Sequence, residues 1–176
     1  MGNNKRGRGS FVAEKPVCIN AWASVAGKKE AQGPLGHCFD KTSRDTYFGQ
    51  KTWELAEKAM QEQALGLVLH KAQVGREDID LVFSGDLLNQ CIGSAFTMRG
   101  TGLPHLGLYG ACSTMAESLI LATMAIGSGA ADRVVSMTSS HFAASERQYR
   151  FPLGYGGQRP PTTQWTVTGA GAVLLS

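Results

Sequence analysis

The stretch LYGACSTMAESLILATMAIG, residues 108–127, decides the fold. Its first two residues end a short apolar run over 104–109 that is typical of a buried strand, and Gly110 permits a sharp turn after that strand. From Cys112 to about Gly127 the sequence then predicts a helix that is apolar nearly all round. Such a helix in a soluble protein belongs at the centre of a fold.

The segments on both sides of this helix alternate between strand and helix patterns. Further strands are predicted over 16–24, 79–85, 133–139 and 166–175, and further helices over 52–71 and 92–99. This order, β-α-β-α-β-α-β-β, predicts an α/β fold with a mostly parallel, helix-covered sheet and an antiparallel final strand. A polar loop of about 25 residues joins the last two strands, and loops of that length are usually functional.

The length and composition of the chain predict one domain. The chain has 176 residues, of which 43% are hydrophobic, and its net charge is +3. We therefore expect a domain over residues 16–176 that follows a disordered basic leader over residues 1–15. The leader carries Lys5, Arg6 and Arg8 without interleaved aromatic residues, which argues against a nucleic-acid-binding arm.

The sequence lacks several segments and motifs that would indicate another class of protein or another location. No apolar run reaches the ~20 residues of a bilayer-spanning helix, and no apolar segment of a signal peptide follows the leader. Phosphate-binding and serine-hydrolase motifs do not occur. No zinc-binding spacing is found among the four cysteines, which are Cys18, Cys38, Cys91 and Cys112. We therefore expect a soluble protein that is not secreted, with free thiols and no metal cofactor.

Three polar side chains follow predicted strands at the point where each strand ends. These are Asp86, Cys112 and His141. Because ligands collect at the carboxyl ends of the strands in open α/β sheets, we expect the three side chains to face one site. Two neighbours join them by position: Asn89 in the GDLLNQ segment, and Glu117, one helical turn after Cys112.

Each of the main candidate site residues also has a structural interpretation. The thiolate of Cys112 would be stabilised by backbone N–H groups and the dipole at the start of a helix, or Cys112 fills a tight core position. Asp86 either lines the site or caps the helix after it. His141 either orients a bound acid or lies in a surface loop. Glu117 either belongs to the site or makes a structural contact within an apolar helix.

The quoted residues also carry a family resemblance. GACST, residues 110–114, resembles the active-site cysteine segment of thiolases and ketoacyl-acyl carrier protein synthases. More specifically, residues 18–176 resemble the stage V sporulation protein AD family, thiolase-fold proteins of endospore formers. The motifs in question are GPLGHCFD (33–40), GDLLNQ (85–90), TSSH (138–141), ERQYRFP (146–152), YGGQRP (155–160) and TVTGAGAVLLS (166–176). The resemblance implies a thiolase-like fold, with this chain supplying the first half of the duplicated core.

The resemblance also implies a function. Proteins of this family bind dipicolinic acid, pyridine-2,6-dicarboxylate, or its calcium chelate, for uptake into the forespore and release at germination. Asp86 and Cys112 match residues that line the family's pocket. Implied partners are other proteins of the same sporulation operon, some in the membrane, so the location would be cytoplasmic or peripheral to the spore inner membrane. Because dipicolinate is a dianion that Asp86 would repel, either calcium lies between them or one carboxyl is protonated.

Two other functions stay open at this point. Acyl transfer, as in the wider superfamily, would use Cys112 as the nucleophile, with partner residues from the second half of the fold. Alternatively, the protein has a structural role in an assembly, with a vestigial pocket. In either case one half of the duplicated fold would expose a large apolar face, so we expect self-association or docking of a second thiolase half.

Overall fold

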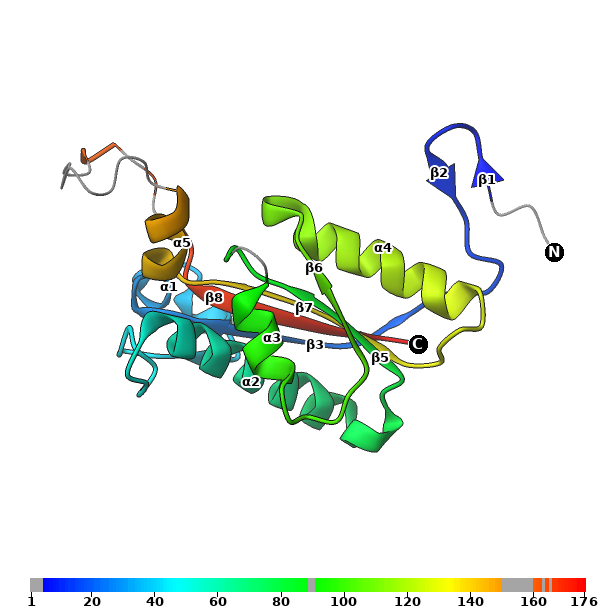
Figure 1. Ribbon diagram of the computed structural model, residues 1–176, viewed down its shortest axis with the longest axis horizontal. Helices are drawn as coiled ribbons and strands as arrows, with labels where there is room; N and C mark the ends of the chain where they lie inside the picture. The colour runs from blue at the N-terminus through cyan, green and yellow to red at the C-terminus, as the bar shows by residue number, and fades with distance from the viewer. Residues whose placement is uncertain (1–4, 89–90, 150–159, 163, 165) are drawn as a thin grey trace.

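A six-stranded sheet forms the centre of the computed structural model, which describes residues 5–88, 91–149, 160–162, 164 and 166–176 (Figure 1). The strand order is β4-β3-β8-β7-β5-β6. β8 is antiparallel to its neighbours β3 and β7, and the remaining neighbours pair in parallel. The predicted mostly parallel α/β sheet with an antiparallel final strand is confirmed. The strands are β3 (Ile19–Ala26), β4 (Lys41–Thr42), β5 (Leu81–Gly85), β6 (His105–Leu108), β7 (Val134–Ser140) and β8 (Gly169–Leu175).

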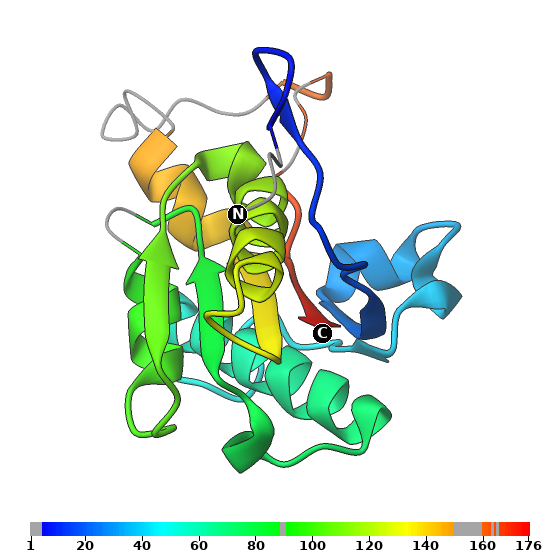
Figure 2. The ribbon, with the colours of Figure 1, turned by 90° about the vertical axis from the view of Figure 1, so that its right-hand side faces the viewer.

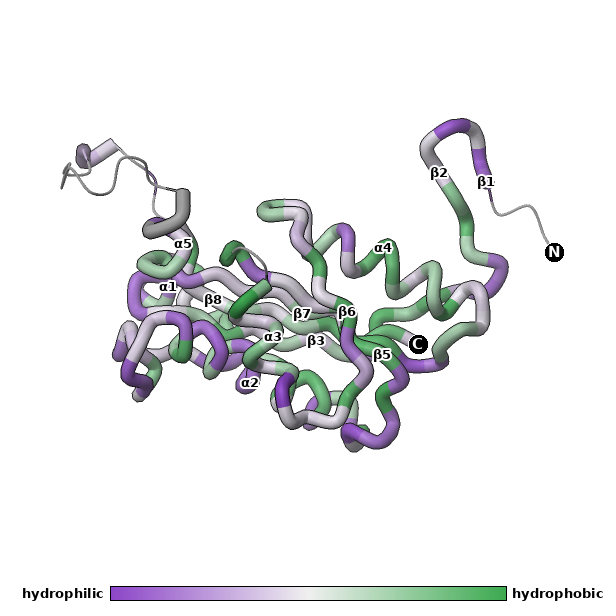
Figure 3. Tube along the Cα trace, in the orientation of Figure 1, coloured by the Kyte–Doolittle hydropathy of each residue, from purple (hydrophilic) through white to green (hydrophobic). Residues whose placement is uncertain are grey.

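Helices cover both faces of this sheet. α2 (Trp53–Ala72) and α3 (Ile92–Met98) lie on one face, and α4 (Thr114–Gly127) lies on the other (Figures 1 and 2). Met60 and Val68 of α2 are fully buried against the sheet, whereas Ala122 of α4 packs with Phe83 on the opposite face. Figure 3 shows mainly hydrophobic residues where β5, β7 and β8 come together. Two apolar layers therefore hold the sheet between its helices.

The ends of α2 explain why this long helix begins and stops where it does. The hydroxyl of Thr52 accepts a hydrogen bond from the backbone N–H of Leu55, which satisfies one of the unpaired donors of the first turn. Gln73 takes a left-handed conformation, with φ of 56°, and ends the helix. The predicted helix over 52–71 thus differs from α2 by one residue at each end.

α4, which we expected to be buried, is covered by the sheet on one side only. Thr114, Ser118 and Ala122 are buried, but Ile120 is 50% exposed and Met124 is 46% exposed. On the same face of the sheet, Trp22 of β3 is 65% exposed. The sequence correctly showed apolar residues on all sides of the helix. The described residues, however, cover only part of its surface.

Four short elements were not predicted. These are α1 (Lys28–Gln32), β4, α5 (Phe142–Tyr149) and a hairpin of β1 (Lys5–Arg6) with β2 (Ser10–Phe11). The hairpin lies within the leader that we expected to be disordered, and it stands away from the sheet in Figures 1 and 2. α5 occupies the first part of the predicted polar loop. Among the described helices, none combines the length and the hydropathy needed to cross a bilayer.

Candidate functional site

An open cavity of about 800 Å³ lies at the carboxyl ends of β5 and β7. Asp86, directly after β5, and Ser139, near the end of β7, contribute to its wall together with Cys112, which precedes α4. Residues 166–171, which include the first three residues of β8, form another side. The cavity therefore occupies the edge of the sheet where ligands collect in α/β folds, and the structure brings Asp86 and Cys112 together on it.

Cys112 is exposed on the wall of the cavity. It lies in a short 3-10 turn, Ala111–Ser113, and the α-helix begins only at Thr114. The left-handed residue of this turn is Ala111, with φ of 48°, whereas Gly110 has φ of −111°. A Cβ at position 110 would lie 2.6 Å from Glu117 Oε2 and 2.7 Å from the Ser113 hydroxyl, so both side chains would have to shift to admit it. The core-filling role considered for Cys112 does not fit its exposure.

Asp86 is 2% exposed, and both of its carboxylate oxygens accept hydrogen bonds. Oδ1 accepts from the N–H of Leu88 at 2.9 Å, and Oδ2 accepts from the N–H and the hydroxyl of Ser94, each at 2.7 Å. Asp86 therefore fixes the start of α3, as the capping interpretation predicted, and it also borders the cavity. Three donors stabilise its negative charge within the fold.

His141 does not line this cavity. It is fully buried, Nε2 donates to the carbonyl of Thr46 at 2.8 Å, and Nδ1 accepts from the N–H of Ala143 at 3.3 Å. Its ring stacks on Trp53 and Phe142, with centroids 6.5 Å and 5.1 Å apart. The predicted convergence of three side chains thus holds for two, because the chain turns inward directly after β7 and takes the imidazole into the core.

The two candidates added by position are placed differently. The carboxylate of Glu117 lies beside Gly110, behind the turn that carries Cys112, and it is not among the residues on the cavity wall. Asn89 lies outside the described residues. The structure therefore places Glu117 next to the turn and off the cavity wall.

A buried polar network beneath the cavity was missed by sequence reasoning. It consists of Glu57 and Gln61 on α2, Ser94 on α3, Ser139 on β7, and Asp86. Gln61 Nε2 donates to the hydroxyls of Ser139 at 2.7 Å and Ser94 at 3.3 Å, and it lies 3.3 Å from the carbonyl oxygen of Gly85. The hydroxyl of Ser139 in turn donates to Glu57 Oε1 at 2.8 Å. The network connects the cavity wall to the buried face of α2.

Glu57 is fully buried in this network. Burial raises the pKa of its carboxyl, the hydrogen bond from Ser139 partly opposes this, and the charges of Asp86 and Glu54 add to the rise, so that the pKa lies at about 8. A signal for this residue exists in the sequence. Glu57 and Gln61 are four residues apart and adjoin the apolar positions Ala56, Met60 and Ala64, so they lie at the buried stripe of the helix.

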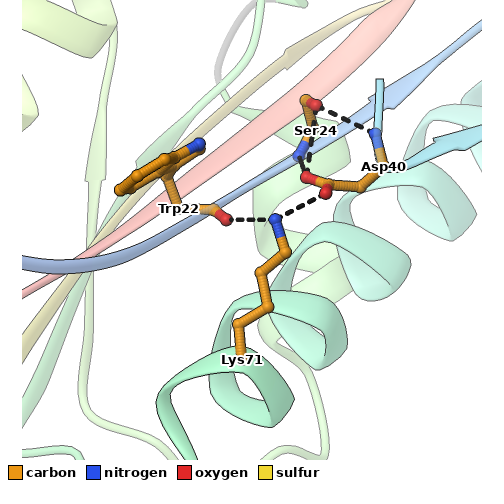
Figure 4. Close-up of polar contacts among 4 residues, drawn as sticks. All are labelled: Trp22, Ser24, Asp40 and Lys71. Carbon is orange, nitrogen blue, oxygen red and sulfur yellow. Dashed lines mark hydrogen bonds and ion pairs between the residues drawn. The ribbon is translucent and has the colours of Figure 1, made fainter. Parts of the chain in front are cut away.

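A second polar cluster fixes the far wall of the cavity, where Ser24 of β3 lies. Asp40 accepts from the N–H and the hydroxyl of Ser24, and Lys71 of α2 donates to Asp40 and to the carbonyl of Trp22 (Figure 4). Burial raises the pKa of Asp40, but the hydrogen bonds from Lys71 and Ser24 outweigh it and hold the pKa below its ordinary value. This cluster ties β3, α2 and the 33–40 motif together.

Within the part of the chain that the structure describes, no group of three or more His, Cys, Asp or Glu side chains is arranged to hold a metal ion. Any calcium at the cavity would therefore need ligand atoms from the bound molecule in addition to those of the protein.

Comparison with solved structures relates this geometry to the thiolase-like fold. A 3-oxoacyl-(acyl carrier protein) synthase III from Aquifex aeolicus VF5 aligns with a TM-score of 0.62 and 17% identity, over 92% of this chain and 54% of its own. OleA from Xanthomonas campestris aligns with a TM-score of 0.57 and 16% identity, over 92% of this chain and 56% of its own. At these identities the likeness shows the fold, and the chain corresponds to about half of each structure.

Sequence comparison is more specific. The stage V sporulation protein AD of Bacillus subtilis strain 168 is 44% identical over 170 residues, which are 97% of this chain and 50% of that protein. The chain thus spans about half the length of this relative. The profile of the same family matches residues 7–176. The chain therefore belongs to the stage V sporulation protein AD family.

Proposed function

We propose that the protein binds dipicolinic acid, or its calcium chelate, in the 800 Å³ cavity and so supports its uptake into the forespore and its release at germination. Family membership gives the process, sporulation. One observation carries the proposal for the site. Asp86 and Cys112 lie on the wall of a single cavity although they are 26 positions apart in the sequence. These are the two residues that, by resemblance of sequence motifs, match pocket residues of the family.

The chemistry of the wall suits a small aromatic dicarboxylate. Phe39 and Met115, which are only partly buried, offer apolar surface to a pyridine ring, and the half-buried Thr138 offers a hydroxyl that donates to a carboxylate. The exposed thiol of Cys112 adds a weak donor. Cavities for small ligands typically measure about 300–1,000 Å³, mostly apolar with a few polar groups, and this cavity falls within that range.

The charge of the ligand is the main obstacle, because Asp86 and Glu30 both line the cavity. The Asp86 charge is directed toward Leu88 and Ser94, whose three donors reduce its effect on a neighbouring anion. Chelated calcium would remove the remaining repulsion, since it neutralises the two ligand carboxylates. Binding is therefore expected to be tighter with calcium than without it.

Isothermal titration calorimetry with dipicolinate, with and without calcium, tests the proposal. Saturable binding is expected, and Cys112→Ala and Thr138→Val should each weaken it roughly five- to tenfold through lost donors. Cys18→Ala, an exposed cysteine away from the cavity, is the matched control and should bind like the wild type. Thermal denaturation establishes that each variant is folded. No heat of binding in a folded protein, with or without calcium, would sink the proposal.

Acyl transfer is the second candidate, and the exposure of Cys112 on a cavity wall favours it. It would require a base near the thiol, whereas the imidazole of His141 is buried and bonded to Thr46. Mass spectrometry after incubation with an acyl-CoA decides between the two functions. An acyl group on Cys112 would support transfer, and an unmodified Cys112 that still reacts with iodoacetamide would count against it. A purely structural role predicts that neither ligand nor acyl group binds.

A further inference from the structure

The two carboxyl groups of the buried polar network are satisfied to different degrees. Asp86 accepts three hydrogen bonds, which stabilise its charged form. Glu57 accepts one, from Ser139, and its Oε2 is buried without a hydrogen-bond partner within the described part of the chain. Leaving an ionised carboxylate so poorly solvated is costly, and a proton on the unsatisfied oxygen removes that cost.

A second unsatisfied atom lies on the same helix, one turn away. Gln61 Oε1 is buried and has no donor among the described residues, while Gln61 Nε2 is held by its contacts with Ser139, Ser94 and Gly85. Those contacts fix the orientation of the amide, so Oε1 is the acceptor that faces away from them. Because residues four apart on a helix are neighbours, a protonated Glu57 would present a donor close to this oxygen.

The surroundings of Glu57 oppose a second negative charge. Among the described residues, the charges that act on it are those of Asp86 after β5 and Glu54 on α2 itself, and both are acidic. α3 brings no titratable side chain, since its sequence is IGSAFTM, and His141 after β7 is bonded to Thr46. Gly93 of α3 lies close to both side chains, since a Cβ there would lie 3.3 Å from the Asp86 carboxyl and 3.4 Å from Glu57 Cγ.

We propose that Glu57 is a positioning residue that holds a proton beneath the cavity, orients the Ser139 hydroxyl, and keeps the cavity floor neutral enough to admit an anionic ligand. The inference rests on the proposed binding of a dicarboxylate. The sequence predicted repulsion between Asp86 and the ligand, and a proton on Glu57 keeps a second buried carboxyl from adding to that repulsion. Loss of the proton adds a negative charge beneath the cavity and weakens binding of the ligand.

The proton and the ligand are then thermodynamically linked. Binding an anion beside Ser139 favours the protonated form of Glu57, so affinity is constant while Glu57 is protonated and falls as it ionises. Burial raises the pKa of this carboxyl to about 8, so the fall begins near that pH. With an effective dielectric of about 20, the loss of affinity between pH 7 and pH 9 is roughly five- to tenfold.

The test compares the wild type with Glu57→Gln, which keeps the shape of the side chain and cannot ionise. Calorimetry with dipicolinate from pH 6.5 to 9 should show affinity that falls above about pH 8 in the wild type and stays constant in Glu57→Gln. Glu62→Gln, on the exposed side of the same helix, is the control and should keep the wild-type profile. Difference infrared spectroscopy of the free protein should show a protonated-carboxyl band at pH 7 that is lost in Glu57→Gln.

The outcomes separate this inference from the proposed function. Dipicolinate binding with the same pH profile in the wild type and in Glu57→Gln would overturn the role of Glu57 while leaving the proposed function intact. If no dipicolinate binds at any pH, the proposed function and the ligand-linked role fail together, and the infrared band alone decides whether Glu57 carries a proton. Absence of that band at pH 7 would overturn the proton assignment in every case.

Discussion

Ser139 joins the cavity wall to helix α2 through a hydrogen bond of 2.8 Å from its hydroxyl to Glu57 Oε1. The same hydroxyl accepts from Gln61 Nε2 at 2.7 Å, so one small side chain connects the surface of the site to two buried polar residues. The cavity wall and the buried polar residues of α2 are therefore coupled. Changes in α2 that look remote from the cavity should alter the site, and changes at the site should alter the stability of the fold.

Gln61→Leu should be strongly destabilising. The substitution leaves the carbonyl of Gly85 and the hydroxyls of Ser94 and Ser139 without their buried donor, at a cost of about 2–3 kcal/mol in the free energy of unfolding. Glu62→Gln breaks only the exposed ion pair with Lys58 and should cost less than about 0.5 kcal/mol. Urea denaturation of both variants measures the difference. Equal stabilities would show that the network contributes nothing to folding.

The pH dependence of stability should report the buried carboxyl of Glu57. Its folded pKa of about 8 lies above the ordinary value of 4.5, so between these values the folded state binds more protons than the unfolded state. The free energy of unfolding should therefore fall as pH rises from 5 to 8. The slope should be on the order of one kcal/mol per pH unit, and the total loss a few kcal/mol at most, that is, about 2–4 kcal/mol. Glu57→Gln should remove this slope in urea titrations. A slope that persists in the variant must come from other groups.

His141→Phe should weaken the fold and leave the site unaffected. The variant loses the bonds to Thr46 and Ala143 in a fully buried position, for which we expect about 1–3 kcal/mol. Dipicolinate affinity should change less than twofold, since His141 does not line the cavity. His70→Gln, at an exposed position on α2, is the control for a histidine substitution. A tenfold loss of affinity in folded His141→Phe would restore His141 to the site.

Lys71→Met tests the cluster that fixes the Ser24 wall. Lys71 bonds to Asp40 and to the carbonyl of Trp22, so its loss should cost about 1 kcal/mol, against less than about 0.5 kcal/mol for Lys58→Met in an exposed helical pair. The pKa of Asp40 lies below its ordinary value of 3.8. The stabilisation from its contact with Lys71 is therefore present above pH 3.8 and is lost as the pH falls through the lowered pKa. The difference from wild type should shrink in acid, as measured by urea denaturation at pH 7 and at pH 3.

The order of the main elements could be predicted from the sequence because each carries a strong apolar pattern. α2, β5, α3, β6, β7 and β8 all lie within about three residues of their predicted bounds. α1, β4 and the N-terminal hairpin could not be predicted, since elements of two to five residues have too few positions to show a period. α5 was missed because its eight residues stand at the start of a long segment rich in polar residues, all of which was predicted to be loop.

The candidate site was predicted in part for a similar reason. The rule that ligands collect at strand ends found Asp86 and Cys112, and it also selected His141, whose side chain turns into the core. The same rule does not apply to Glu57 and Gln61, which lie in the middle of a helix 25 or more residues before Asp86. Their contact with the site depends on how α2 packs against β7, which no local pattern reveals.

Protection of Cys112 by dipicolinate tests the central claim most directly. The rate at which iodoacetamide alkylates each cysteine can be followed by mass spectrometry, with exposed Cys18 as the internal reference. Burial and the charges of Asp86 and Glu117 raise the pKa of half-buried Cys91, so it should react more slowly than Cys112 without ligand. Saturating dipicolinate should slow alkylation of Cys112 at least severalfold and leave Cys18 unchanged. Equal rates at Cys112 with and without dipicolinate, in a folded protein, would contradict binding in this cavity.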